Sequence, residues 1–306
     1  MIAIKRILCP IDFSVYSRHA LDHAVAIAKW YESALTLLHV HPVMPISAYA
    51  PGTAVVPAVL AVHERDALRL AIEQLARERG AAGLPIETEV IEGPTAAGIL
   101  DKANAMPADL LVMGTHGHAG FDRFVLGSVT EKVVRKAACP VLTVPAAVAD
   151  AAPPAVLFKN IVCAVDFSDC SMSALEYAMS IAQEADASLT LVHVIELPPE
   201  IPREVHENAP AWPLNVAEYV AIAERSRLAR LQDAVPQRVR DYCSVDFVVT
   251  TGKAYREILR VAEEKTAGLV VVGIHGRGHI DRLLFGSTAQ HLVRLASCPV
   301  LTLRKG

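Results

Sequence analysis

Short apolar runs alternate along the chain with longer stretches whose apolar residues recur at helical spacing. In the first half the apolar runs are Ile7–Ile11, Leu35–Val40, Ile86–Ile91, Leu110–Gly114 and Val141–Val144. The helical stretches are Ser17–Tyr31, Val59–Arg79, Thr95–Ala105 and Ser128–Ala138. Several runs are almost continuously apolar and β-branched, which is typical of parallel strands that are covered on both faces. The alternation predicts βαβ units and an open, doubly wound α/β sheet.

The second half of the chain repeats the first. The segment "RILCPIDFS" recurs as "NIVCAVDFS", and "CPVLTVP" recurs as "CPVLTLR". The order and spacing of the repeated segments predict a tandem duplication, with one domain over residues 1–146, a linker rich in Ala and Pro over 147–157, and a second domain over 158–306. The apolar runs of the second half are Ile161–Val165, Leu189–Ile195, Val245–Val249, Leu269–Val272 and Val300–Leu303.

Two proline-rich stretches interrupt the pattern at equivalent places, over residues 41–59 and 196–215. Proline breaks helices because it lacks a backbone donor, so neither stretch is expected to form a regular helix. Long loops in compact domains often carry function. One interpretation is that these stretches fold over or beside a binding site; the other is that they are tolerated insertions.

Composition and charge exclude several classes of protein. Apolar residues make up 53% of the chain and charged residues 20%, which indicates a sizeable core. A net charge of −4 without any basic run argues against nucleic acid as the main partner. The sequence shows neither a long uncharged apolar segment nor a signal-peptide pattern, so we expect a cytoplasmic protein with no membrane partner. The cysteines form no CxxC pair and are expected to be buried thiols.

A glycine pattern occurs once in each half, at the end of the fourth apolar run. Its form is G-x2-G-x9-G-S, at Gly114, Gly117, Gly127 and Ser128, and again at Gly273, Gly276, Gly286 and Ser287. Glycine lets a backbone approach a ligand closely. The Gly-Ser pair opens a predicted helix whose first N–H groups and dipole favour an anion. Asp12 and Asp166 follow the first run of each half, at the sheet edge where doubly wound folds bind ligands. The repeated pattern therefore predicts two phosphate-binding loops, each beside an aspartate.

These motifs resemble those of the universal stress protein family in its tandem two-domain form, over essentially the whole chain. The resemblance rests on "PIDFS" and "AVDFS", "LLHV" and "LVHV", both glycine loops and both "CPVLT" endings. It implies two five-stranded parallel sheets of order 3-2-1-4-5, the adenine nucleotide alpha hydrolase-like fold. It also implies that members with this glycine pattern bind ATP. The last strands of the family pair edge to edge, so the two halves are expected to form an internal pseudo-dimer.

The resemblance also assigns roles to individual residues. Asp12 and Asp166 would contact the adenine side, together with the main chain of Val40 and Val194. Ribose and phosphates would be held by Gly114, Gly117, Gly127, Ser128 and Val129 in the first half, and by Gly273, Gly276, Arg277, Gly286, Ser287 and Thr288 in the second. Mg²⁺ would bridge the phosphates, because it needs few protein ligands.

The two loops differ in charge at one position. Arg277 is the basic residue usual in such loops, whereas the first loop has His118 there. We therefore expect the second site to hold ATP better than the first. The histidines of the loops do not have the ligand spacing of a zinc site, so no metal bound by the protein alone is expected.

The first functional hypothesis is an ATP-binding sensor or regulator of a stress response that acts through a protein partner. No Ser-His-Asp or Cys-His set occurs at a recognisable spacing, so an enzyme is not expected beyond slow ATP hydrolysis. The alternatives are a weak ATPase, and a partner-binding or chaperone-like scaffold whose nucleotide sites are vestigial. The sequence leaves open the identity of the partner and whether two chains form a homodimer.

Overall fold

The structure is a computed structural model, and it describes residues 2–43, 45–46, 56–57, 60–117, 126–145, 158–196, 216–274 and 286–304. The chain divides into two compact units. The N-terminal unit comprises Ala3–Leu157 together with Ser297–Arg304, and the C-terminal unit consists mainly of Phe158–Ala296. The predicted linker over residues 147–157 lies outside the described residues.

The N-terminal unit is built on a parallel sheet in the order β5-β2-β1-β6-β7. Its strands are β1 (Arg6–Pro10), β2 (Ala34–His41), β5 (Ile86–Glu92), β6 (Leu110–Gly114) and β7 (Val141–Val144). Its helices are α1 (Val15–Tyr31), α2 (Val62–Glu78), α3 (Thr95–Ala105) and α4 (Ser128–Lys136). Two short strands, β3 (Pro45–Ile46) and β4 (Val56–Pro57), form a separate antiparallel pair. Counted along the chain, the order of the main sheet is 3-2-1-4-5, as predicted.

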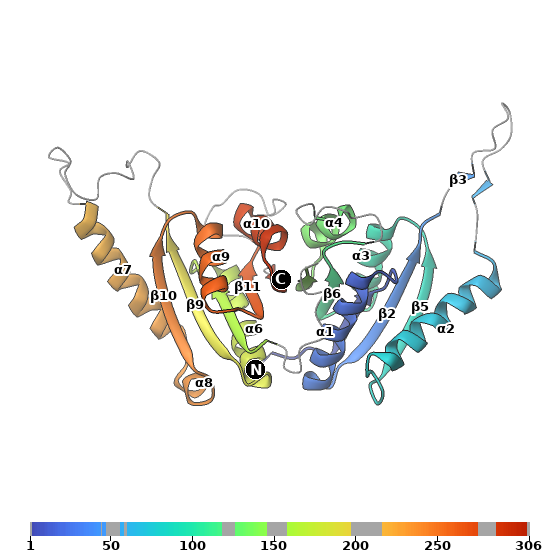
Figure 1. Ribbon diagram of the computed structural model, residues 1–306, viewed down its shortest axis with the longest axis horizontal. Helices are drawn as coiled ribbons and strands as arrows, with labels where there is room; N and C mark the ends of the chain where they lie inside the picture. The colour runs from blue at the N-terminus through green and yellow to red at the C-terminus, as the bar shows by residue number, and fades with distance from the viewer. Residues whose placement is uncertain are drawn as a thin grey trace, which may run out of the picture. The chain divides into compact units, whose positions relative to one another are not determined.

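The strand order changes direction between β1 and β6, and this places the helices in two layers. The chain moves from β1 through β2 to β5, and then returns through β6 to β7. Because βαβ crossovers are right-handed, α1 and α2 cover one face of the sheet and α3 and α4 cover the other (Figure 1). Strand β6 is buried at every position, as expected for a strand that is covered on both faces.

The last strand of the chain, β12 (Val300–Leu303), completes the N-terminal unit by pairing antiparallel with β7. Thr143 lies opposite Val300 and donates its hydroxyl proton to the Val300 carbonyl oxygen at 3.1 Å. Thr302 makes the reciprocal hydrogen bond to the Val141 carbonyl oxygen, also at 3.1 Å. Both threonine side chains are fully buried. The predicted pairing of the last strands is therefore confirmed, while the internal pseudo-dimer stays a prediction.

The C-terminal unit repeats the same arrangement in the order β10-β9-β8-β11. Its strands are β8 (Asn160–Ala164), β9 (Ser188–Ile195), β10 (Val245–Thr251) and β11 (Leu269–Gly273). Its helices are α6 (Asp169–Glu184), α7 (Val216–Asp233), α8 (Gln237–Tyr242), α9 (Ala254–Glu264) and α10 (Ser287–Leu295). Helix α8 was not predicted from the sequence. None of the described helices is long and apolar enough to cross a membrane.

The cysteines are free thiols, and all but the half-buried Cys139 are buried. Burial raises the pKa of Cys9 and Cys163 far above the ordinary value and raises the pKa of Cys139 to about 11. Because the thiolate is the reactive form, these three side chains are inert at neutral pH. This agrees with the prediction of buried thiols.

Candidate functional site

The turn that follows the first strand has the same geometry in both units. Asp12 Oδ1 accepts hydrogen bonds from the backbone N–H of Ser14 at 3.0 Å and from its hydroxyl at 2.5 Å. Asp166 Oδ1 accepts the same two bonds from Ser168, at 2.9 and 2.6 Å. Ser14 and Ser168 in turn cap α1 and α6, because each hydroxyl accepts the N–H of the residue three positions further on. The turn thus fixes each carboxylate at the carboxyl end of its strand.

The residue after each aspartate has a left-handed backbone, which is uncommon for a phenylalanine. Phe13 and Phe167 both have φ of 64°. Their rings lie beside a histidine at the end of the second strand, with centroids 5.5 Å apart for His39 and 4.8 Å apart for His193. Each histidine donates from Nδ1 to the carbonyl oxygen of the residue before the aspartate, at 2.7 Å. The hydrogen bond and the ring contact thus join the turn that carries the aspartate to the second strand in each unit.

In the N-terminal unit, the predicted glycines lie where a Cβ would come very close to neighbouring atoms. A Cβ at Gly117 would lie 2.7 Å from Asp12 Oδ2, so the loop passes directly beside the carboxylate. A Cβ at Gly114 would lie 2.8 Å from an atom of the first turn of α1. The N–H of Gly127 donates to the Thr115 carbonyl oxygen at 2.9 Å, which joins the two ends of the loop. The structure thus brings Asp12 and the three loop glycines to the same sheet edge.

The C-terminal unit repeats these close approaches. The N–H of Gly286 donates to the Ile274 carbonyl oxygen at 3.0 Å, and a Cβ at Gly286 would lie only 2.4 Å from that oxygen. A Cβ at Gly273 would lie 2.9 Å from the backbone at the start of α6. The predicted Gly276 and Arg277 lie outside the described residues, as does His118 of the first loop.

The helices that begin at Gly127 and Gly286 differ from α1 and α6 at their first turn. Within the described residues, no side chain caps the N-terminus of α4 or α10. Ser128 and Ser287 are exposed at the first helical position, and Val129 and Thr288 are partly exposed behind them. The first N–H groups of a helix have no intrahelical partner, and the helix dipole adds positive potential there. Both turns can therefore receive an anion.

The C-terminal unit has a cavity of about 610 Å³, which is lined by the predicted residues that the structure describes there. Its lining includes Asp166, Val194, Gly273, Gly286, Ser287 and Thr288. It also includes His193, which belongs to the repeated "LVHV" segment, and residues that the sequence did not single out: Glu196 beside the end of β9, Tyr219 and Arg227 from α7, and Ala254 and Ile258 from α9. Cavities of this size hold small molecules such as cofactors.

Two arginines of α7 lie near the cavity, and their spacing is visible in the sequence. Arg227 and Arg230 are three residues apart, so they share one face of the helix. Their guanidinium carbons lie 6.0 Å and 4.0 Å from the centroid of the Phe167 ring. Helical periodicity could have grouped the two arginines, but not their position over a residue far away in sequence.

The side chain of Val40 packs close to α3 in the N-terminal unit. It is buried, and a Cβ at Gly98 of α3 would lie 3.1 Å from one of its methyl groups. Gly98 therefore leaves room for the valine methyl groups beneath α3. This is compatible with the main-chain role that the resemblance assigns to Val40, which stays a prediction.

Among the described residues, no group of three or more His, Cys, Asp or Glu side chains could hold a metal ion. His116 instead makes a hydrogen bond with the hydroxyl of Thr115, at 2.9 Å. The loop residues His118, His275 and His279 lie outside the described residues.

Comparison with known proteins gives one family. The model of the universal stress protein family matches residues 3–145 and 157–304. A universal stress protein of Mycolicibacterium smegmatis is 28% identical over 306 residues, which cover 97% of this chain and 96% of the relative. Universal stress protein MJ0531 of Methanocaldococcus jannaschii is 37% identical over 142 residues, or 46% of this chain and 81% of the relative. The crystal structure of a universal stress protein from Archaeoglobus fulgidus covers 100% of both chains at 21% identity with a TM-score of 0.66, a likeness of fold.

Proposed function

This chain belongs to the universal stress protein family as a tandem of two domains, and from that premise we propose that it binds ATP in both halves and acts as a sensor or regulator of a stress response. The nucleotide would lie across the carboxyl ends of the first and fourth strands of each half. A protein partner would recognise the nucleotide-bound form.

One observation carries the proposal: Asp166 and the uncapped first turn of α10 line the same cavity. A carboxylate suits the exocyclic amine of adenine, which donates hydrogen bonds. Unpaired backbone N–H groups at a helix N-terminus suit phosphate. One small molecule with an amine at one end and phosphates at the other satisfies both features.

The glycines at the ends of the loops also support the proposal. A side chain at Gly286 would run into the Ile274 carbonyl oxygen, and one at Gly117 would run into the carboxylate of Asp12. Glycine at these positions keeps the carboxylate and the helix turn accessible. When bound, Mg²⁺ would neutralise phosphate charge, with most of its ligands coming from phosphate and water.

The contacts of the cavity favour binding over turnover. Asp166 Oδ1 accepts two bonds from Ser168, and Glu196 Oε1 accepts the Ala254 N–H at 2.9 Å. His193 is buried and bonded from Nδ1 to a backbone carbonyl oxygen. Each of these side chains could move a proton, and each has one atom engaged in a structural hydrogen bond.

The test is calorimetric titration of the full chain with ATP and Mg²⁺, after any nucleotide that copurifies has been extracted and identified. We expect two sites in the wild-type protein, and Asp12→Ala and Asp166→Ala should each weaken one of them about tenfold or more. Asp246→Ala is the matched control, because this aspartate lies on β10 with its side chain exposed. Absence of nucleotide binding by the wild-type protein would end the proposal.

A further inference from the structure

One face of α7 forms a wall of the C-terminal cavity. The lining includes Tyr219, Ala223 and Arg227, which are spaced four residues apart and therefore lie on the same side of the helix. Tyr219 is exposed, whereas Ala223 and Arg227 are half-buried. None of the residues assigned to nucleotide binding comes from α7, so the role of this face in the cavity is still to be assigned.

The strand order places this face at the base end of the cavity. Strand β8 lies between β9 and β11, and α7 packs on β9 and on the edge strand β10 (Figure 1). The first turn of α10, which suits phosphate, follows β11 on the other side of β8. The guanidinium carbon of Arg227 lies 6.0 Å from the centroid of the Phe167 ring, and Phe167 directly follows Asp166. Arg227 therefore lies with Asp166 at the end of the cavity that we assign to adenine, away from the phosphate turn.

The guanidinium of Arg227 makes neither a hydrogen bond nor an ion pair within the part of the chain that the structure describes. Arg230 packs closer to the ring of Phe167, at 4.0 Å from the centroid, and so takes the near position over it. A guanidinium carries five N–H donors and no acceptor, and a half-buried one without a polar partner is costly. A ligand that places a hydrogen-bond acceptor at this end of the cavity would remove that cost.

We propose that Arg227 recognises the base: its guanidinium donates a hydrogen bond to a ring nitrogen of adenine beside the exocyclic amine, while the Asp166 carboxylate accepts from that amine. The inference rests on the nucleotide site proposed above and deepens it by adding a residue that selects the base. Adenine carries the acceptors N1 and N7 on the two sides of its amine, so a donor next to the carboxylate suits either edge of the ring. Hypoxanthine has a carbonyl oxygen in place of the amine, and this oxygen would face the Asp166 carboxylate without a proton between them.

The experiment uses the full chain carrying Gly127→Val, which obstructs the N-terminal loop so that one site is measured; Asp12→Ala provides a second, independent background. Dissociation constants are determined with Mg²⁺ for ATP, adenosine, 1-deaza-ATP and 7-deaza-ATP, where each deaza compound has a C–H group in place of one flanking nitrogen. The series is repeated with Arg227→Met, which keeps an unbranched apolar stem and removes the donors. Arg225→Met is the matched control, because Arg225 is exposed on the same helix, where its Nε donates to the Ala221 carbonyl oxygen.

We expect Arg227→Met to weaken ATP and adenosine by the same factor, about tenfold, because the lost hydrogen bond is to the base. One of the two deaza compounds should bind the background protein about tenfold more weakly than ATP, and this difference should disappear in Arg227→Met. A difference that persists in Arg227→Met, deaza compounds that bind as tightly as ATP, or a loss confined to ATP would overturn the role of Arg227 while leaving the nucleotide site intact. A wild-type protein that binds none of the four compounds would overturn the proposed function itself.

Discussion

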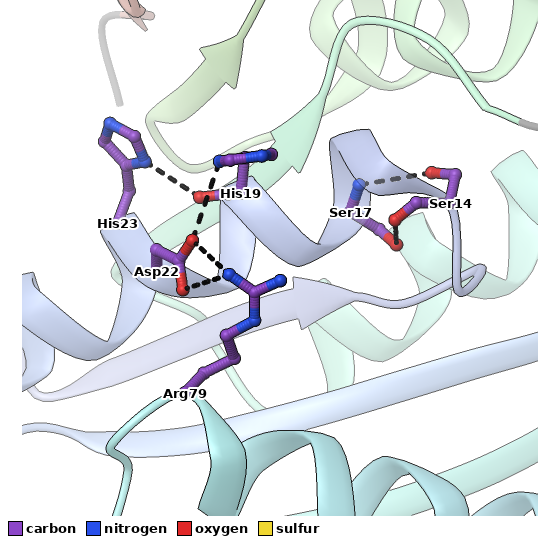
Figure 2. Close-up of polar contacts among 6 residues, drawn as sticks. All are labelled: Ser14, Ser17, His19, Asp22, His23 and Arg79. Atoms are coloured by element: carbon purple, nitrogen blue, oxygen red, sulfur yellow. Dashed lines mark hydrogen bonds and ion pairs between the residues drawn. The ribbon is translucent and has the colours of Figure 1, made fainter. Parts of the chain in front are cut away.

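Acidification should destabilise the N-terminal unit through one buried imidazole, that of His23 on α1. The side chain is 3% exposed, and its Nδ1 donates to the His19 carbonyl oxygen at 2.8 Å (Figure 2). The pKa of His23 is lowered to about 4, mainly by burial; the backbone hydrogen bond opposes this shift, and the nearby His19 imidazole adds to it. In the unfolded chain the same group titrates near its ordinary pKa of about 6.5.

The sign of the effect follows from the two pKa values. Between pH 6.5 and 4 the unfolded chain binds this proton and the folded chain does not, so the free energy of unfolding falls as the pH falls. Each unit of pKa difference is worth about 1.4 kcal/mol, so the full loss approaches about 3 kcal/mol below pH 4. About 2 kcal/mol of it should already be lost at pH 5.

Asp22, four residues from Arg18 and one from His23 on the same helix, acts in the opposite direction. Burial raises the pKa of Asp22, against the lowering effects of Arg79 and His19. Its carboxylate accepts two bonds from the Arg79 guanidinium at 3.0 and 3.3 Å, and lies 3.6 Å from His19 Nδ1 (Figure 2). The folded unit therefore gains stability as Asp22 takes up its proton at the acidic end of the range. The contribution of His23 is best measured between pH 5 and 7.

The assay is urea unfolding at pH 5, 6 and 7, followed by the fluorescence of Trp30 on α1 in a Trp212→Phe background. We expect His23→Leu to lower stability at pH 7 but to lose most of the pH dependence of the wild-type protein. His291→Leu is the control, because His291 makes the same bond to a carbonyl oxygen one turn earlier but is only half-buried, stacked on the ring of Tyr255. A His23→Leu protein with the full pH slope would refute the reasoning.

Three further substitutions test the packing of the loops and strands. Gly286→Ala should cost about 1–3 kcal/mol of stability and weaken ATP binding. Both effects should exceed those of Gly127→Ala, because the Cβ at Gly286 would lie 2.4 Å from a backbone oxygen, against 3.0 Å at Gly127. Equal urea midpoints for the two variants would contradict this. Thr143→Val should cost about 1 kcal/mol by removing the hydrogen bond to β12, seen as a lower melting temperature. Ser168→Ala should cost about 1 kcal/mol through loss of the α6 cap and release the Asp166 carboxylate, so unchanged stability and ATP affinity would count against the described turn.

The elements that local pattern determines were predicted closely. Helix α3 and strands β6 and β7 have the predicted bounds, because each is one uninterrupted apolar or helical run between clear breaks. Helix α1 begins at Val15, two residues before the predicted start at Ser17, because Ser14 caps it. Helix α8 was missed because its six residues are too few to show a period. The strand order came from the family resemblance, since pairing partners are chosen over long distances in sequence.

The candidate site also contains residues that the sequence predicts and residues that it does not. Asp12 and the glycines of its loop were predicted from spacing, and the structure brings them to one sheet edge. The left-handed phenylalanines could not be predicted, because that backbone region normally favours glycine or asparagine. Arg227 was missed for a different reason: its place at the cavity depends on how α7 packs against a turn some sixty residues earlier.

Strands β7 and β12 pair antiparallel and belong to one covalent chain, and this affects the free energy of their pairing. The residues of β7 are essentially inaccessible to water: Val141, Leu142, Thr143 and Val144. Without β12 they would form an exposed edge strand with unpaired N–H and C=O groups. In the fused chain, the complementary strand is tethered at high local concentration, so the two strands pair regardless of how dilute the protein is. The covalent link between β7 and β12 thereby makes the pairing of these two strands a property of every single molecule.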